Sequence, residues 1–544
     1  MDHADLSFDP SAPPSKRVDG DTTKFTLVGG GIASMAAAVF LIRDGDILGR
    51  NITILEELDT PGGSLDASGS AAHGYVLRGG RMFESKYLCT FDLFSSIPAL
   101  DGTRTVTQEI FAWNETLKTS SKSRLFRDGQ RQVAPEFGLS ERQILAIERL
   151  ALESEATLGQ ASIAEQFDAA FFTTNFWLMW CTTFAFQPWH SAVEFKRYLL
   201  RFAHMVGGFN RLLGIMRTTY NQYDSLVRPL LKWLDARGVT IQYNTRVTDL
   251  GFIDGAGETT VTHIATEVDG KPAMITLGSG DCVLVTLGSM TEASSYGDMD
   301  TAPVLLGKQD GGAWTLWERI ATGRPNFGRP SVFCNHIEQS KWVSFTTTLH
   351  DPTLLRLIRD STGNVPGEGG LITFPQSNWL ASIVIPHQPH FIGQPDDVGV
   401  FWGYGLSVDK PGNFVKTPMS ASTGRGIMTE ILGHLRVEAE AVRIMESAIC
   451  IPCMMPFITS QFLPRRRGDR PQVVPKGSTN LAFVGQFCEL PLDVVFTVEY
   501  SIRSAQLAVN ALLGMTRTPP AVYQGKFDPR VLFKAFAALH DIRS

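Results

Sequence analysis

The segment from Phe25 to Arg43 constrains the fold of this chain more than any other. Phe25-Thr-Leu-Val28 is typical of a short buried strand, Gly29-Gly30-Gly31 of a tight turn, and Ile32 to Arg43 of a helix that is apolar nearly all round. This order opens a βαβ unit, in which Gly29 permits the turn and Gly31 lets the backbone approach a pyrophosphate. Because the glycines divide an almost uncharged run, we predict a strand and a helix rather than a membrane span.

A second strand and an acidic residue follow in the expected order. Ile52-Thr-Ile-Leu55 ends at Glu56, which lies 25 residues after Gly31 and can accept hydrogen bonds from a ribose diol. Ser34 stands where a third glycine is usual, and a glycine triplet alone is most often a loop. With strand, turn, helix, strand and acid together, the segment predicts a dinucleotide site.

Later segments favour FAD over NAD as that dinucleotide. Val283-Leu-Val-Thr286 is a strand that runs into Leu287-Gly288-Ser289, and Leu481-Ala-Phe-Val484 is a strand that runs into Gly485. A helix from Phe496 to Leu513 would aim its N-terminus at the flavin ring. The alternative is that these are ordinary strands and a helix of an α/β sheet.

Composition sets outer limits on the architecture and the partners. A chain of 544 residues exceeds one hydrophobic core, so two or more domains are expected. The net charge of −6, from 49 basic and 55 acidic side chains, makes nucleic acid an improbable partner. Residues 1–23 lack an apolar run and are predicted to be a disordered lead-in.

The seven cysteines have no regular spacing, which indicates a reducing compartment, and we expect a cytoplasmic protein. Cys450 and Cys453 form the only close pair. Since no second pair and no histidines accompany them, we interpret both as core thiols and expect no metal site.

Ordered motifs along nearly the whole chain carry a family resemblance. They are Leu41-Ile-Arg-Asp-Gly45, Ile54-Leu-Glu-Glu-Leu58, Gly62-Gly-Ser-Leu-Asp66, Arg78-Gly-Gly-Arg81, Asn175-Phe-Trp177, Phe184-Ala-Phe-Gln-Pro-Trp-His-Ser191, Tyr220-Asn-Gln-Tyr-Asp-Ser225, Gly312-Ala-Trp-Thr-Leu-Trp317, Gly468-Asp-Arg-Pro471 and Thr497-Val-Glu-Tyr-Ser501. With these motifs the chain resembles the oleate hydratases, flavoproteins also called myosin-cross-reactive antigens. The resemblance implies addition of water to the cis-9 double bond of an unsaturated free fatty acid, without net redox change of FAD.

The resemblance also implies an α/β (α+β) fold with a discontinuous Rossmann-type FAD-binding domain. We expect this domain to comprise residues 24–90, 225–300 and 472–520, with a helical region at 91–224, a substrate-binding domain at 301–471 and a C-terminal cover segment at 521–544. The residues expected to bind FAD are Gly29, Gly31, Ser34, Glu56, Glu57, Ser64, Gly80, Arg81, Val247, Thr286, Ser289, Phe496 and Thr497.

Tyr198 aligns with the family tyrosine that donates a proton to the alkene. Ser191-Ala-Val-Glu194 is a capping-box pattern, so a helix is predicted to begin at Ser191 and to end near Gly207-Gly208. One apolar stripe of this helix then contains Phe195, Tyr198, Leu199, Phe202 and Val206. By spacing alone, such a tyrosine is most often a core residue, and only the family match singles it out.

The flavin-facing loop departs from the family at one catalytic position. The family has Arg-Glu-Met-Glu where this chain has Arg81-Met82-Phe83-Glu84, so a carboxylate assigned to water activation is replaced by a thioether. We expect activity to persist, with Glu84 as the candidate that orients or deprotonates water. The alternative is that Glu84 only holds the loop by hydrogen bonds.

The residues for the fatty carboxylate are a second departure. Gln222 matches the family glutamine with this task, but it could also be a turn amide bonded to backbone. The family Thr-x-Asn pair falls on Val384 and Pro386, which have no side-chain donors. His387 and His390 are candidate replacements, either as imidazolium or as neutral N–H donors.

The remaining expectations concern partners and competing functions. Arg465-Arg466-Arg467 with Arg470 is interpreted as a solvated cluster, with FAD phosphates or an anionic membrane surface as alternatives. The chain stops soon after Leu539, from which we expect a monomer with at most transient membrane contact. A flavin oxidoreductase of the amine oxidase or desaturase type is the alternative enzyme, and Met82 also leaves a lipid carrier open.

Overall fold

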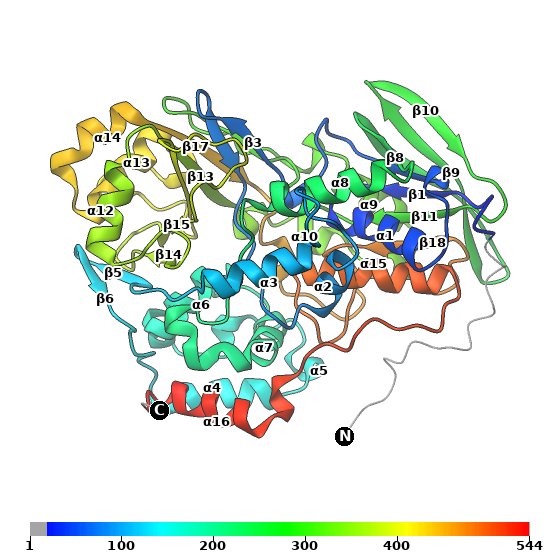
Figure 1. The fold of residues 1–544 in the computed structure, drawn as a ribbon. Coiled ribbons are helices and arrows are strands. Elements are labelled where there is room, and N and C mark those ends of the chain that lie inside the picture. The colour runs from blue at the N-terminus through cyan, green and yellow to red at the C-terminus, as the bar shows by residue number, and fades with distance from the viewer. Residues whose placement is uncertain (1–18, 543–544) are drawn as a thin grey trace.

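The computed structural model describes residues 19–542 of the chain. Most of the predicted lead-in at 1–23 lies outside the described residues; within them, the N–H groups of Thr22 and Thr23 close a turn on the Asp19 carbonyl. Figure 1 shows a parallel sheet with helices on the right, a larger sheet at the upper left and a group of helices below. No helix among residues 19–542 is long and apolar enough to cross a bilayer.

The glycine fingerprint lies in a five-stranded parallel sheet of order β18-β11-β1-β2-β7. Its strands are β1 Phe25–Val28, β2 Ile52–Leu55, β7 Thr240–Gln242, β11 Cys282–Thr286 and β18 Leu481–Val484. Four of the five match predicted strands, and α1 spans Ile32–Arg43 as predicted. The buried helix α1 packs against α15, Val498–Leu512, beside the sheet (Figure 1). This arrangement confirms the Rossmann-type fold class.

Three segments far apart in the sequence thus build one sheet, and an antiparallel sheet extends from it. This second sheet has the order β10-β9-β8, with β8 at Thr245–Gly255, β9 at Glu258–Val268 and β10 at Lys271–Thr276. The predicted domain boundaries themselves stay a prediction.

The larger sheet has eight strands in the order β12-β17-β13-β16-β15-β14-β5-β6. Their bounds are β5 Leu125–Arg127, β6 Gln130–Gln132, β12 Ser295–Tyr296, β13 Trp342–Leu349, β14 Gly370–Thr373, β15 Ala381–Ile385, β16 Gly399–Gly405 and β17 Ala448–Met455. The hairpin of β3, Ala67–Ser70, and β4, Gly74–Leu77, docks on it, because the Tyr75 N–H donates to Thr348 Oγ1 at 2.8 Å. This contact brings the loop that follows β4 between the five-stranded sheet and the eight-stranded sheet.

Helices complete the two layers and the lower part of the molecule. They are α2 Leu88–Phe94, α3 Val106–Thr116, α4 Glu141–Leu152, α5 Glu155–Leu158, α6 Asn175–Phe184, α7 Ala192–Arg201, α8 Arg228–Asp235, α9 Ala313–Ala321, α10 Ser331–Cys334, α11 Ile337–Ser340, α12 Thr353–Thr362, α13 Gly424–Leu435, α14 Ala441–Ser447 and α16 Pro529–Leu539. All seven cysteines, Cys450 and Cys453 included, are free and buried, as expected for core thiols.

Two helix predictions are corrected. The helix predicted from Ser191 to Gly207-Gly208 is α-helical only to Arg201 and continues as the 3₁₀ helix η5, Ala203–Arg211. Its Ser191 cap is present, but the Glu194 side chain does not complete the box, because it pairs with two arginines described below. The helix predicted from Phe496 begins at Val498, since Phe496 has a left-handed backbone with φ of 68°.

Candidate active site

The loop after β4 and helix α7 line one largely apolar cavity. From the loop come Gly80, Arg81, Met82, Phe83, Glu84 and Tyr87, from α6 and α7 come Thr183, Phe184, Tyr198 and Phe202, and Ile215, Phe496, Thr497 and Val498 close it. The predicted stripe runs from α7 into η5 and faces inward, and its members Phe195, Tyr198, Leu199, Phe202 and Val206 are all buried. The structure therefore places Tyr198, Met82 and Glu84 on the wall of the same cavity.

Tyr198 is a buried phenol surrounded by aromatic rings. Phe184 and Phe186 contact its ring edge to face, with centroids 4.9 Å and 5.0 Å away. Its hydroxyl donates to the Val495 carbonyl at 2.5 Å. Burial raises the pKa of Tyr198 well above its ordinary value, and Tyr87 adds to the shift. The phenol is therefore protonated across the physiological range.

Glu84 is held by an ion pair and not left free. Arg201 Nη1, in the last turn of α7, lies 2.7 Å from its Oε1, and His204 Nε2 lies 3.3 Å from its Oε2. The Lys86 N–H donates to the same Oε2 at 2.7 Å. Burial raises the pKa of Glu84, but the hydrogen bond to His204 and the charge of Arg201 outweigh it and hold the pKa below its ordinary value. A lowered pKa makes this carboxylate a weaker base.

Met82 lies on the loop between two anchored neighbours. Phe83 exchanges backbone hydrogen bonds with Met216 in both directions, at 3.0 Å and 2.8 Å. The Arg81 carbonyl accepts from the Gln222 amide at 3.2 Å, while the Arg81 side chain lies 5.2 Å from the Phe496 ring centroid and donates to the Ser64 carbonyl at 3.5 Å. The half-buried Met82 thioether thus faces the cavity from a fixed backbone, without a carboxylate of its own.

The glycine turn forms a cradle that suits a dinucleotide. Gly31 is the N-cap of α1, no side chain caps this helix, and a Cβ at Gly31 would meet no atom within 4 Å. Helix N–H groups beside open space are a binding site for a pyrophosphate. Glu56 lies next to it and accepts from the N–H groups of Gly30, at 2.6 Å, and Leu58, at 2.9 Å.

Other predicted cofactor residues surround this cradle or connect it to the cavity. Ser34 Oγ lies 3.2 Å from Thr286 Oγ1 at the end of β11. Glu57 pairs with Arg246 at 2.6 Å, one residue before Val247 on β8, and Ser289 accepts from the Trp314 indole through its carbonyl. Thr497 caps α15, so the N-terminus of that helix opens on the cavity that contains Tyr198.

A second cavity adjoins the first at Gly80 and Arg81, which line both. It brings Gln222 together with His387 and His390, a pair of histidines far from Gln222 in sequence. Its wall also contains Trp113, Leu117, Arg217, Thr218, Thr219, Gly367, Pro386 and Trp402. The Gln222 amide donates to the Arg81 carbonyl at 3.2 Å. Burial lowers the pKa of His390 to about 3, with a contribution from Arg217, so this imidazole is neutral at physiological pH.

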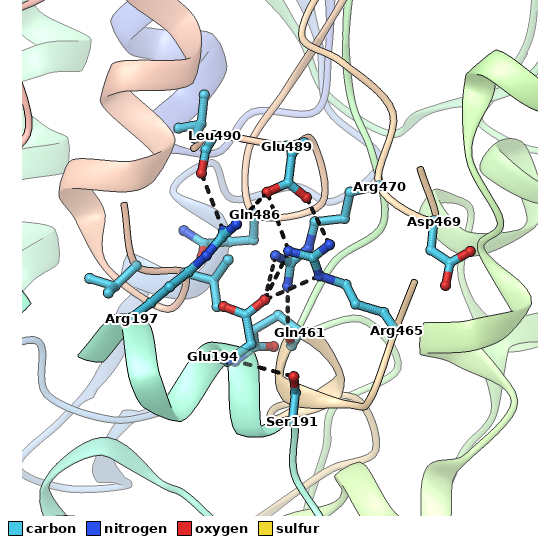
Figure 2. A network of polar contacts seen from close by, with 12 residues as sticks. Ser191, Glu194, Arg197, Gln461, Arg465, Asp469, Arg470, Gln486, Glu489 and Leu490 are labelled. Atoms are coloured by element: carbon cyan, nitrogen blue, oxygen red, sulfur yellow. Dashed lines mark hydrogen bonds and ion pairs between the residues drawn. The ribbon is translucent and has the colours of Figure 1, made fainter. Parts of the chain in front are cut away.

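Only half of the basic run at 465–470 is the solvated cluster that its sequence suggested: Arg466 and Arg467 are exposed, whereas Arg465 and Arg470 are not. Arg465 and Arg470 are buried and pair with Glu194 of α7, at 3.1 Å and 2.9 Å (Figure 2). Glu489 joins the same network through Arg197, at 3.0 Å, and Arg465, at 2.8 Å. The network ties the helix that contains Tyr198 to the segment that leads to Val495.

Sequence reasoning missed Arg201, His204 and Arg217. The two Glu84 partners come three and six residues after Tyr198, and Arg217 comes five residues before Gln222, so their proximity to assigned residues was the available signal. The C-terminal segment also reaches this region: α16 packs on η5, and the Tyr523 ring lies 5.0 Å from that of His204.

Fold and site together define an α/β protein with a Rossmann-type sheet, a glycine-rich turn that suits a dinucleotide and an aromatic cavity lined by the loop after β4. The model of the MCRA family matches residues 22–510, and the chain belongs to that family. This finding confirms the predicted resemblance.

Two named relatives and one solved structure are similar to the chain. It is 39% identical to an oleate hydratase of Streptococcus pyogenes serotype M49 (strain NZ131), over 98% of this chain and 92% of the relative. It is 32% identical to a linoleate hydratase of Lactiplantibacillus plantarum, over 95% and 99%. The structure of cyclohexylamine oxidase from Brevibacterium oxydans IH-35A matches with a TM-score of 0.51 at 11% identity, over 92% of this chain and 99% of that one, and shares the fold alone.

Proposed function

We propose that the protein adds water to the cis-9 double bond of an unsaturated free fatty acid such as oleate, giving a 10-hydroxy acid. The names of the two relatives, an oleate hydratase and a linoleate hydratase, support this substrate class. The single observation that carries the proposal is Tyr198, a buried phenol on the wall of an aromatic cavity. An apolar cavity accepts an acyl chain, and a protonated phenol can act as a general acid on its alkene.

The proton balance of this reaction runs through Tyr198. Its hydroxyl gives a proton to C9 while positive charge develops at C10, where a water oxygen forms the new bond. The proton that this water loses returns to the phenolate, so the enzyme is regenerated and one water is consumed. No electrons leave the substrate, and the step is a lyase-type hydration.

We infer that FAD is the dinucleotide. Gly29, Gly31 and the N-terminus of α1 would hold its pyrophosphate, and Glu56 would accept from its ribose. When bound, FAD supplies shape and electrostatic stabilisation of the positive charge near C10. Arg81 and Phe496, which contact each other on the cavity wall, would position the ring end of the cofactor.

Glu84 takes a supporting role in this proposal. Its ion pair with Arg201 and its lowered pKa favour a carboxylate that holds the loop to α7 and counters developing positive charge. Water would then be oriented by backbone groups of the 80–84 loop and attack a nearly formed cation. The enzyme is therefore expected to be active in spite of Met82.

The carboxylate end of the substrate is assigned to the second cavity. Gln222, His387 and His390 meet there, and the two cavities adjoin at Gly80 and Arg81, so one extended chain can occupy both. Because the His390 pKa is about 3, this residue would act as a neutral N–H donor and not as an imidazolium. We also infer a cytoplasmic location from the seven buried free thiols, while the expected monomeric state stays a prediction that light scattering checks.

Incubation of the FAD-loaded protein with oleate in oxygen-18 water tests the reaction. The product should be 10-hydroxystearate labelled at the hydroxyl, formed without oxygen uptake or stoichiometric reductant. Unlabelled product, or product that forms only as oxygen is consumed, would overturn the proposal. Anaerobic bleaching of the flavin by oleate would instead identify an oxidoreductase, and unchanged oleate bound to the protein would identify a lipid carrier.

A further inference from the structure

Arg217 is a cation without a counterion in the second cavity. Among residues 19–542, its guanidinium makes neither an ion pair nor a hydrogen bond, and its Nε and Nη2 atoms are buried. Burial lowers the pKa of Arg217 to about 10, so it is still protonated at neutral pH. A buried charge without a partner is costly, because the protein does not replace the lost hydration.

The backbone that carries this guanidinium is nevertheless fixed on both sides. Asn114, on α3, accepts from the Arg217 N–H at 2.9 Å and donates to its carbonyl at 2.8 Å. The preceding residue, Met216, forms the backbone pair with Phe83 of the loop after β4. Arg217 is thus positioned relative to Met82 and Tyr198 while its charged end is free, as a preorganised binding group requires.

The other residues of this cavity complement an anion of carboxylate size. Gln222, Thr218, Thr219 and His387 bring polar side chains to the wall, and no aspartate or glutamate of the described part of the chain lines it. The neighbouring His390 is neutral, so Arg217 and Arg81 are the charged side chains on this wall. None of Gly29, Gly31 and Glu56 lines this cavity, which separates it from the pyrophosphate cradle.

We propose that Arg217 binds the carboxylate of the fatty acid and takes over from the donors that Val384 and Pro386 lack. A guanidinium can donate two parallel hydrogen bonds to a carboxylate, which suits the two free nitrogens. Pro386 lines the cavity, whereas Val384 is buried in β15 outside it. The assignment rests on the proposed function for the identity of the acid, but it can be tested without turnover.

The test compares the binding of myristate and of myristyl alcohol, which share a chain and differ at the head group. Dissociation constants are measured on the FAD-loaded protein by competition with a fluorescent fatty-acid probe, below the solubility limit of the alcohol and the micellar concentration of the acid. Arg217→Met should weaken myristate binding about 10- to 100-fold and leave the alcohol unchanged, because only the acid loses a charge-assisted pair. Arg217→Lys should retain part of the preference for the acid, since it keeps the charge and loses the fork.

Arg211→Met is the matched control. Arg211 is an exposed arginine six residues earlier that contacts Ser120, so its loss should alter the binding of neither ligand. Equal loss of acid and alcohol affinity in Arg217→Met, or an unchanged preference for the acid, would overturn the assignment.

Thermal unfolding of the wild type and Arg217→Met distinguishes a binding role of Arg217 from a structural one. Arg217→Met should leave the unfolding midpoint of the FAD-loaded protein unchanged or raise it, because the variant removes an uncompensated buried charge. Myristate should raise the midpoint of the wild type and lose this effect in Arg217→Met. A large drop in the variant midpoint without ligand would show that Arg217 serves the fold. If Arg217 passes these tests but oleate gives no labelled 10-hydroxystearate in oxygen-18 water, the proposed hydratase activity is wrong. The binding of a fatty carboxylate by Arg217 is then still supported.

Discussion

The Tyr198 hydroxyl donates to the Val495 carbonyl oxygen, 2.5 Å away, at the entry to the loop that caps α15. This hydrogen bond orients the phenol from a segment almost three hundred residues further along the chain. In the proposed reaction it also sets the state from which proton transfer would begin, because the O–H would have to turn from Val495 to the alkene.

Tyr198→Phe should lower kcat for oleate by about 10²- to 10⁴-fold, the usual contribution of a positioned general acid. The fold should persist, since one hydrogen bond contributes only about 1 kcal/mol. Hydration rates at matched FAD occupancy measure this effect. Since burial raises the pKa of Tyr198, ionisation of this phenol should not reduce the wild-type rate between about pH 8 and 10. Full activity of the variant would remove Tyr198 from catalysis.

Met82→Glu should raise kcat on the order of 10-fold, because it adds a carboxylate to a cavity wall whose existing carboxylate, Glu84, is held by Arg201. Met82→Gln is the neutral control of nearly the same shape and should not raise the rate. The measurement is initial rate against pH for the three proteins. Equal rates in Met82→Glu and the wild type would mean that the thioether is not what limits turnover.

Gly31→Ala and Gly30→Ala should separate cofactor binding from folding. At Gly31 a Cβ meets no protein atom, so the unfolding free energy without FAD should change by no more than about 0.5 kcal/mol. The same methyl group would occupy the pyrophosphate cradle and weaken FAD binding on the order of 10-fold or more. At Gly30 a Cβ lies 2.6 Å from Glu56 Oε2, so the second variant should unfold more easily.

Flavin fluorescence titration and thermal unfolding of the FAD-free proteins provide the two readouts. Unchanged FAD affinity in Gly31→Ala would place the pyrophosphate elsewhere.

The sequence was sufficient where a feature depends on near neighbours. The strand, turn and helix from Phe25 to Arg43 follow from glycines and periodicity, and the stripe that buries Tyr198 follows from helical spacing. The role proposed for Arg217 could not be predicted from near neighbours. Whether its guanidinium has an ion-pair partner depends on which side chains α3 and the eight-stranded sheet bring near it. Glu194 and Arg465 were misassigned for the same reason: 271 residues separate the partners, and each alone fits a common local pattern.

The Glu489 carboxylate should set part of the acid stability of the protein. Burial raises its pKa, but Arg197, Arg465 and Arg470 outweigh this and hold the pKa at about 2, against an ordinary value of 4.5. Because the folded pKa is the lower one, the contribution to stability is complete above about pH 4.5. It is lost as the pH falls from there through about 2. Such a difference amounts to about 3 kcal/mol at neutral pH.

Glu489→Gln should therefore lower the free energy of unfolding at pH 7 by about 3 kcal/mol or somewhat more, since it also leaves buried arginines short of a partner. Between about pH 4.5 and 2 its stability should fall less steeply than that of the wild type. Denaturant unfolding at several pH values measures both effects. Glu115→Gln is the control, because Glu115 pairs with Lys118 at the surface with both side chains largely exposed, and should change stability by less than about 1 kcal/mol. If the free energies of unfolding of Glu489→Gln and the wild type fall in parallel on acidification, the network shown in Figure 2 does not cause the loss of stability at low pH.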